Sequence, residues 1–151
     1  MSIKVRPARI AEADAISRVI LAALRTSNAR DYPVSVIERV QSGFGPGAIE
    51  RFMLQRQMFV ASEGNVVVGT ASLEGEVVRS VFVNPDRHRQ GIGRLLMAEL
   101  EAVARNAGAV RMVVPSSLTA QAFYLALGFN VVREHLEGEE RTLIMERQLR
   151  V

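Results

Sequence analysis

The sequence predicts an α+β fold in which a mixed, mostly antiparallel sheet of about seven strands carries helices on both faces, a three-layer arrangement. Three strand-like runs follow one another between residues 58 and 83, joined by short glycine-bearing connectors, which predicts an antiparallel meander. After Pro85, helical and strand-like apolar spacings alternate, which predicts a β-α-β-α continuation. The length of 151 residues suits a single domain covering residues 1–151.

The N-terminal part is predicted to form a short strand followed by helices. Residues 3–6 alternate between apolar and basic side chains, which indicates a strand. Apolar residues between positions 12 and 24 recur at i, i+3, i+4, i+7 and i+8, the spacing of one helix face. Asp31 is expected to cap a second short helix that turns Ile37 and Val40 inward.

The middle of the chain is expected to hold one more short helix and the meander. The helix covers Ala48–Leu54, after a glycine-rich connector. The three strands cover Met58–Ser62, Val66–Leu73 and Glu76–Val83, and their connectors are too short for anything but antiparallel pairing.

The C-terminal part is expected to alternate helices and strands. A long helix carries its apolar stripe at Ile92, Leu95, Leu96, Leu100, Val103 and Ala107. A strand over Val110–Val114 is expected to end at Pro115, because proline cannot donate to a ladder. A helix over Ala120–Leu127 then precedes two closing strands, Phe129–Glu134 and Thr142–Leu149.

Composition narrows the chemistry. The chain has no cysteine and two histidines, which excludes disulfides, a thiol nucleophile and cysteine-ligated metals, so we expect no metal. Lys4 is the only lysine, the net charge is +3 and the arginines are scattered, so we expect no nucleic-acid partner; association through the arginines is a third, weaker alternative. The chain has no run of 18 apolar residues and no secretory N-terminus, which predicts a cytoplasmic protein without a membrane partner.

The stretch from Val81 to Arg94 carries the clearest functional signal. A strand leads into a basic turn, and Gly91 and Gly93 then open an amphipathic helix. Glycines let the backbone approach a ligand, and the first turn of a helix offers unpaired N–H groups and the positive end of its dipole. The turn also carries three arginines, Arg87, Arg89 and Arg94. These features predict a phosphate or pyrophosphate site.

Two common phosphate loops do not fit this stretch. A P-loop ends in Gly-Lys-Ser/Thr, whereas Arg94 follows Gly93. A dinucleotide-binding fingerprint needs a small residue where Leu96 stands, within a parallel βαβ unit. Alternatively, the two glycines only shape the helix start and the arginines form a solvated face.

The surrounding motifs resemble those of a known family. A hydrophobic strand, a proline, a basic turn, Gln-Gly-Ile-Gly at 90–93 and then Arg-x-Leu-Leu resemble motif A of the GNAT superfamily of acetyl-CoA-dependent N-acetyltransferases. The segment Ala-x-x-Phe-Tyr-x-x-x-Gly-Phe at 120–129 resembles the motif B region. The resemblance runs from about Ile3 to the C-terminus. It implies a GNAT-like fold and acetyl transfer from acetyl-CoA to a primary amine, by direct attack in a ternary complex without a metal.

The resemblance also implies a coenzyme site. The family's pyrophosphate loop falls on residues 88–93, with His88 departing from the usual first residue, and the strand that pairs with the pantetheine arm falls on residues 81–83. Val83 is the candidate amide for polarising the thioester carbonyl, and Ser117 stands where many members carry asparagine. The implied coenzyme-binding residues are Val81, Phe82, Val83, His88, Arg89, Gln90, Gly91, Ile92, Gly93, Arg94, Ser117, Ala120 and Phe123.

Tyr124 matches the family's general acid, which supplies a proton to the departing sulfur. On local sequence alone, a tyrosine beside Phe123 is more often a packed residue, and the motif Phe-Tyr-x-x-x-Gly-Phe is what favours the catalytic role. The general base is less defined, because Arg79 stands where members often carry an acidic residue. We therefore expect a water relay to remove the proton of the acceptor amine.

The acceptor side is expected to lie around the connector of the first two helices, since acceptor selection in the family falls there. Asn28, Asp31 and Tyr32 are its candidate contacts, and Arg79 is a fourth. If strand alternation holds, Arg79 shares a face with Val81 and Val83 near the slot, and its guanidinium favours an acceptor that carries a carboxylate.

An alternative within the same fold is a non-catalytic sensor or interaction module that binds acyl-CoA. The arginine at position 79 and the departures at His88 and Ser117 motivate it. The acceptor is a small molecule or peptide that the sequence does not identify. The closing strands from Phe129 onward are expected to mediate a homodimer, as they do in many relatives.

Overall fold

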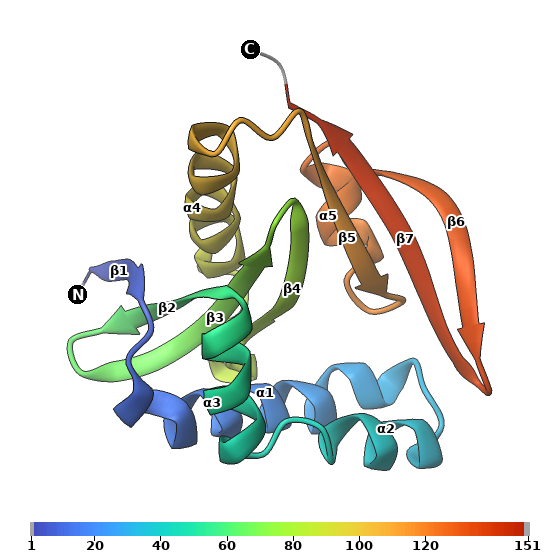
Figure 1. Ribbon diagram of the computed structural model, residues 1–151. Coiled ribbons are helices and arrows are strands. Elements are labelled where there is room, and N and C mark those ends of the chain that lie inside the picture. Colours follow the sequence, from blue (N-terminus) through green and yellow to red (C-terminus); the bar gives the residue numbers. More distant parts are fainter. Residues whose placement is uncertain (1, 150–151) are drawn as a thin grey trace.

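The computed structural model describes residues 2–149, and its centre is one seven-stranded sheet (Figure 1). The strand order is β1-β2-β3-β4-β5-β7-β6, and only the β4–β5 pair is parallel. The mixed, mostly antiparallel sheet is confirmed. The strands are β1 (Ile3–Pro7), β2 (Gln57–Glu63), β3 (Val66–Glu74), β4 (Val77–Val83), β5 (Arg111–Ser117), β6 (Asn130–Glu137) and β7 (Glu140–Gln148).

Helices cover both faces of this sheet, as predicted. The α-helices are α1 (Ala13–Thr26), α2 (Val34–Gln41), α3 (Pro46–Gln55), α4 (Ile92–Asn106) and α5 (Gln121–Ala126). Short 3₁₀ turns lie at η1 (Ile10–Glu12), η2 (Asn28–Arg30) and η3 (Pro85–Arg87). Figure 1 shows α1, α2 and α3 below the sheet, α4 above β2 and β3, and α5 behind β5. In the described part of the chain, no helix has both the length and the apolar character to cross a membrane.

The two faces of the sheet bury two separate cores, because successive strand residues point to opposite sides. On β2, Phe59 and Ala61 join the core under α4, whereas Met58 and Val60 join the core under α1 and α3. Side chains from α4, β5, α5 and β7 complete the first core. The sheet separates these cores, and the site described below forms where β4 and β5 part within it.

The second helix starts without the cap that we predicted. Pro33 occupies the N-cap position of α2, and no side chain caps the helix. Asp31 instead accepts a hydrogen bond from Thr119 Oγ1 at 2.7 Å. The prediction was wrong because a contact with a distant loop uses the carboxylate that the local pattern assigned to the cap.

The inner face of α4 is rotated slightly from the predicted stripe. Leu95 is 45% exposed, whereas Met97 and Ala104 are buried beside Ile92, Leu96 and Leu100. The sheet lies against the 92-96-100-104 row of this helix, so Leu95 falls on its margin.

Strand β5 continues through Pro115 to Ser117, beyond the predicted end. The N–H of Val113 points towards β4 and donates to the carbonyl of Glu76, the residue before that strand, at 3.0 Å. By strand alternation, the nitrogen of Pro115 faces the same edge. The strands share no register pair beyond Val113, so no ladder bond is lost there.

Strand β6 forms one edge of the sheet, and all its residues are exposed. Three large apolar side chains lie among them, Val131, Val132 and Leu136. The homodimer expected through the closing strands stays a prediction.

Candidate active site

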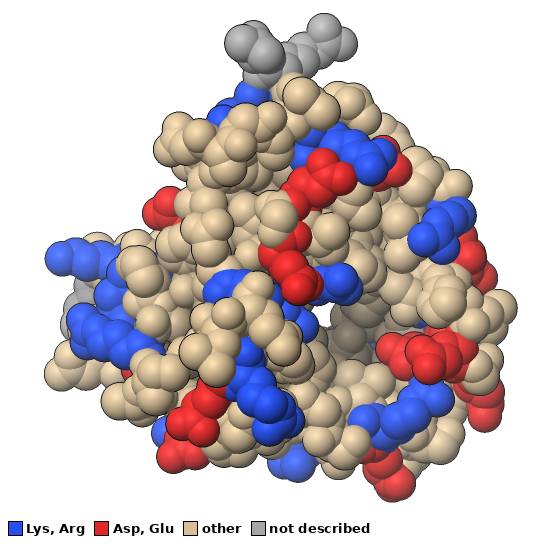
Figure 2. Space-filling view, viewed as in Figure 1, with Lys and Arg blue, Asp and Glu red and all other residues tan. Residues whose placement is uncertain are grey.

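The site begins where β4 and β5 separate. The two strands share one register pair, Val77 with Val113, while β4 pairs along its length with β3 and β5 pairs along its length with β7. A cavity of about 720 Å³ occupies the opening. Its lining includes Val83 and Phe123 from the α4 side and Phe82 and Phe44 from the α1 side. The cavity therefore passes between the strands, and Figure 2 shows it as a hollow near the middle of the face.

A β-bulge at Ser80 shapes the β4 side of this cavity. Phe82 pairs with Thr70 and Arg79 pairs with Ser72, so an extra residue lies opposite Ala71. Ser80 has a φ of 54°, a left-handed backbone that such bulges accommodate. The extra residue breaks the alternation of the strand.

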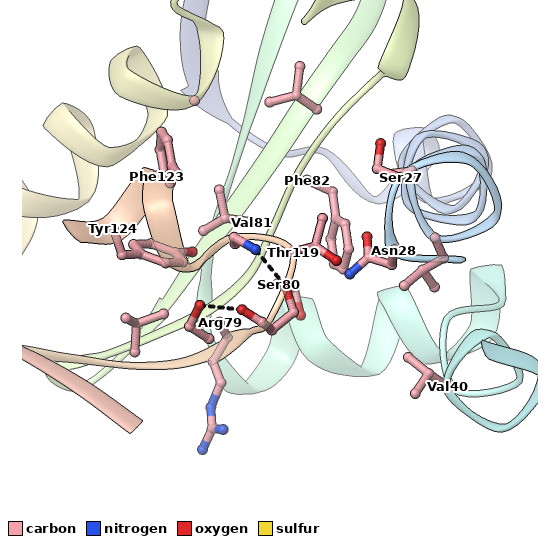
Figure 3. Close-up of a pocket in the computed structure, with 18 of the residues that line it drawn as sticks. Ser27, Asn28, Val40, Arg79, Ser80, Val81, Phe82, Thr119, Phe123 and Tyr124 are labelled. Carbon is pink, nitrogen blue, oxygen red and sulfur yellow. Dashed lines mark hydrogen bonds between the residues drawn. The ribbon is translucent and has the colours of Figure 1, made fainter. Parts of the chain in front are cut away.

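The bulge moves Arg79 to the other face from the one we expected. Because Ser72 and Thr70 are two residues apart on β3, their partners Arg79 and Phe82 share one face. Val81 and Val83 pack instead against the α4 core. The expectation that Arg79 shares their face was wrong. Arg79 lines the cavity, donates from Nε to Glu74 Oε1 at 3.3 Å, and extends away from the cavity centre in Figure 3.

The turn after β4 presents a row of unpaired backbone donors. Gly91, the N-cap of α4, has a φ of 75°, and Arg89 has a φ of 66°. The N–H groups of the six residues from Arg89 to Arg94 donate to no acceptor within residues 2–149. A helix N-terminus with free N–H groups stabilises an anion. The turn can therefore accommodate an anion, and the phosphate site stays a prediction.

Two of the three arginines at this turn are available to a ligand. Arg87 is held by Glu63, with Nη2 2.6 Å from Oε1. Arg89 and Arg94 form no ion pair in the described part of the chain, and both line the cavity. Gly93 brings α4 against α5, because a Cβ there would lie 3.0 Å from the Phe123 ring. His88, Gly91 and Ile92 also line the cavity, whereas Gln90 does not.

Tyr124, on α5, lines the cavity. It is 4% exposed, and its ring packs edge-to-face on Phe123 and Phe129, with centroids 5.1 and 5.5 Å away. Its hydroxyl forms no hydrogen bond with any described residue, and Figure 3 shows it pointing from α5 into the cavity. Burial raises the pKa of the phenol above its ordinary value. Tyr124 therefore keeps its proton at neutral pH.

The connector between α1 and α2 crosses the cavity to the C-terminal strands. The Tyr32 hydroxyl donates to Arg141 O at 2.7 Å and accepts from the Leu118 N–H at 2.8 Å. Burial raises the pKa of Tyr32, against the smaller lowering effect of the Leu118 N–H. Asn28 is buried and lines the cavity, whereas Asp31 lies outside the lining, on Thr119.

Comparison with known proteins agrees with this geometry. Residues 28–145 match the acetyltransferase (GNAT) domain family. The chain belongs to the GNAT family of acetyltransferases. The predicted family and enzyme class, an acyltransferase, are confirmed.

Solved structures show the same GNAT fold. A GCN5-related N-acetyltransferase from Rhodopseudomonas palustris has a TM-score of 0.92 at 22% identity, with 99% of this chain and 97% of that chain covered. The PaiA N-acetyltransferase from Thermoplasma acidophilum, in complex with coenzyme A, has a TM-score of 0.85 at 18% identity, with 99% and 100% covered. YncA from Salmonella typhimurium, with acetyl-CoA, has a TM-score of 0.69 at 24% identity, with 100% and 96% covered.

The sequence patterns missed two charged residues of the GNAT domain's cavity. Arg56, at the end of α3, donates from Nη1 to Ser80 Oγ at 3.1 Å. Glu140, the only acid among the lining residues that the structure describes, is paired with Arg39 at 2.8 Å. No local motif marks either residue. Both reach the cavity through pairings between distant segments.

Replacing Tyr32 by phenylalanine should destabilise the GNAT domain. The variant removes the hydroxyl but leaves a carbonyl and an N–H, those of Arg141 and Leu118, without their partner. The expected loss in the free energy of unfolding is about 1–3 kcal/mol, measured by urea titration. The control is Tyr124→Phe, whose hydroxyl has no hydrogen bond to lose. Equal stability of the two variants would contradict the role of Tyr32.

Proposed function

We propose that this GNAT domain transfers an acetyl group from acetyl-CoA to a primary amine of a small-molecule acceptor, by direct attack in a ternary complex. The observation that carries the proposal is the cavity between β4 and β5. Its lining includes the turn with free N–H groups, the buried phenol of Tyr124 and residues of α1 and α2. The coenzyme A and acetyl-CoA in the structures of PaiA and YncA support the choice of donor.

The chain offers two sets of groups to the donor. The free N–H groups of residues 89–94, with Arg89 and Arg94, suit its pyrophosphate. The β4 edge that faces β5 has no partner strand beyond Val77, so the pantetheine arm can add to it as a strand does. Ser117 Oγ is engaged by the Ala120 N–H at 3.2 Å, so it contributes less than the free backbone groups.

The N–H of Val83 is placed to polarise the thioester carbonyl. The next N–H, that of Asn84, donates to Val68 O on β3 at 2.8 Å. By alternation, the Val83 N–H lies on the opposite edge, towards the cleft. An N–H fixed at the point where negative charge develops is an effective stabiliser in acyl transfer.

Tyr124 acts as the general acid in this proposal. Bound acetyl-CoA supplies an activated acetyl group whose thiolate leaves when the amine attacks. The Tyr124 hydroxyl, protonated and without a competing hydrogen bond, donates a proton to that sulfur. The acceptor amine loses its proton to water, since Glu140, the acid in the cavity lining, is paired with Arg39.

Calorimetry and a thiol-release assay test the proposal together. Purified protein should bind coenzyme A in a titration and release free thiol from acetyl-CoA when a suitable amine is added. A protein that binds coenzyme A but releases no thiol with any amine would instead be the acyl-CoA sensor. A protein that does not bind coenzyme A would refute both.

The kcat/KM of the transfer should rise with pH and should not fall again near the ordinary pKa of tyrosine. The acceptor must be a free base, so kcat/KM increases as its ammonium deprotonates. Tyr124 must stay protonated, and burial holds its pKa above the usual value of about 10. We expect kcat/KM, measured from pH 6 to 10.5, to reach a plateau. A decline centred below pH 10 would contradict the role of Tyr124.

A further inference from the structure

The part of the cavity next to α1 and α2, here called the acceptor chamber, combines an apolar wall with two arginines. The phenyl rings of Phe44 and Phe82 pack edge-to-face with centroids 5.7 Å apart. The apolar lining on this side consists of Ala23, Leu24, Val36, Ile37, Val40, Phe44 and Phe82. Arg56 and Arg79 line the same side, where the bulge at Ser80 turns Arg79 away from the α4 face.

The guanidinium of Arg56 is held rigidly. Its central carbon lies 3.9 Å from the centroid of the Phe52 ring, and Nη1 donates to Ser80 Oγ at 3.1 Å. These two contacts fix the plane of the group before any ligand binds. The Ser80 hydroxyl is neutral, so it leaves the positive charge in place.

No carboxylate neutralises Arg56 within residues 2–149. Its Nε is a buried atom with no hydrogen-bond partner among the described residues. Burial and the neighbouring Arg79 lower the pKa of Arg56, and Glu74 opposes this only in part. Glu74 itself pairs with Arg79. The Arg56 guanidinium therefore carries a positive charge at the cavity wall without a carboxylate partner among the described residues, and a bound anion would supply one.

We propose that the acceptor is a small amine that carries a carboxylate and an apolar body, with its carboxylate bound by Arg56. This inference rests on the acetyltransferase function proposed above and names its acceptor class. The apolar body packs against Phe44, Phe82 and Val40, and the amine is directed through the opening towards Val83 and Tyr124. A guanidinium binds a carboxylate through parallel hydrogen bonds, which fixes orientation as well as affinity.

The connector limits the size of the acceptor. Tyr32 and Asp31 join it to the β5–α5 loop and β7, and Arg39 on α2 pairs with Glu140 on β7. These contacts bridge the chamber from α1 and α2 to the C-terminal strands. A folded protein that presents a lysine would have to break them, whereas a free amino acid would not.

Steady-state kinetics on matched amines test this assignment. The probes are L-leucine, L-methionine, L-phenylalanine and 6-aminohexanoate, each beside its carboxamide, with spermidine as a cationic amine. We expect the best carboxylate to exceed its carboxamide at least tenfold in kcat/KM. Arg56→Gln should lower kcat/KM for that carboxylate at least tenfold by raising its KM. The kcat/KM of the matching carboxamide and the KM of acetyl-CoA should change less than twofold. Arg56→Lys should fall between, because it keeps the charge but loses the planar fork.

Arg51→Gln is the matched control, since Arg51 is exposed on α3 and does not line the cavity. It should leave all these constants unchanged. The unchanged carboxamide rate shows that Arg56→Gln is folded. If kcat/KM for spermidine or for the carboxamides equals that for the carboxylates, the acceptor assignment is overturned while the transferase proposal stands. If no amine releases thiol, the transferase proposal fails, and the assignment fails with it.

Discussion

Tyr124→Phe should lower kcat by roughly 10²- to 10⁴-fold, the range that a positioned general acid contributes. The variant keeps the ring and its packing on Phe123 and Phe129. It removes only a hydroxyl that has no hydrogen bond among the described residues, so the departing sulfur must take its proton from water. Binding of coenzyme A should stay within twofold of the parent, because the pyrophosphate groups are untouched. The measurement is kcat by thiol release, with calorimetry for binding.

The two tyrosines of this chain serve as controls for each other. Tyr32→Phe is expected to reduce stability with a small effect on kcat, and Tyr124→Phe is expected to reduce kcat with a change in stability within about 0.5 kcal/mol. An unchanged kcat in Tyr124→Phe at saturating acceptor would show that solvent protonates the sulfur. A loss of coenzyme binding in the same variant would assign Tyr124 to packing.

The elements of the fold could be predicted because their signals are local. Residues 3–6 alternate, short glycine-bearing connectors separate β2, β3 and β4, and α4 carries a helical apolar stripe. The turn at residues 84–94 could also be located from the sequence, since its glycines and arginines all lie within residues 87–94 and its backbone donors follow from a helix start.

The acceptor side could not be predicted, because its geometry depends on pairings between distant residues. The bulge at Ser80 adds one residue to β4, and nothing in its local sequence separates it from regular alternation. Arg56 and Ser80 are 24 positions apart, and Tyr32 and Arg141 are 109 apart. Their contacts follow only from the register of the sheet and the docking of the connector.

Gly91→Ala should weaken coenzyme A binding about tenfold or more. Gly91 has a φ of 75°, where a residue with a Cβ pays roughly 1–2 kcal/mol. The backbone can relieve this strain by rotating, and the N–H groups from Arg89 to Arg94 then no longer point together at one diphosphate. A tenfold change in Kd corresponds to about 1.4 kcal/mol, so a rotation that weakens a single charge-assisted hydrogen bond suffices.

Gly108→Ala separates this effect from strain in the helix itself. Gly108 follows the other end of α4, its φ is 85°, and no atom lies within 4 Å of the Cβ position at either glycine. The two variants should therefore lose similar free energies of unfolding in urea, while only Gly91→Ala raises the Kd of coenzyme A in calorimetry. Equal weakening by both variants would mean that binding depends on helix stability alone. Parent-like binding by Gly91→Ala would remove the turn from the coenzyme site, and the acetyl donor would then have to be held elsewhere in the cavity.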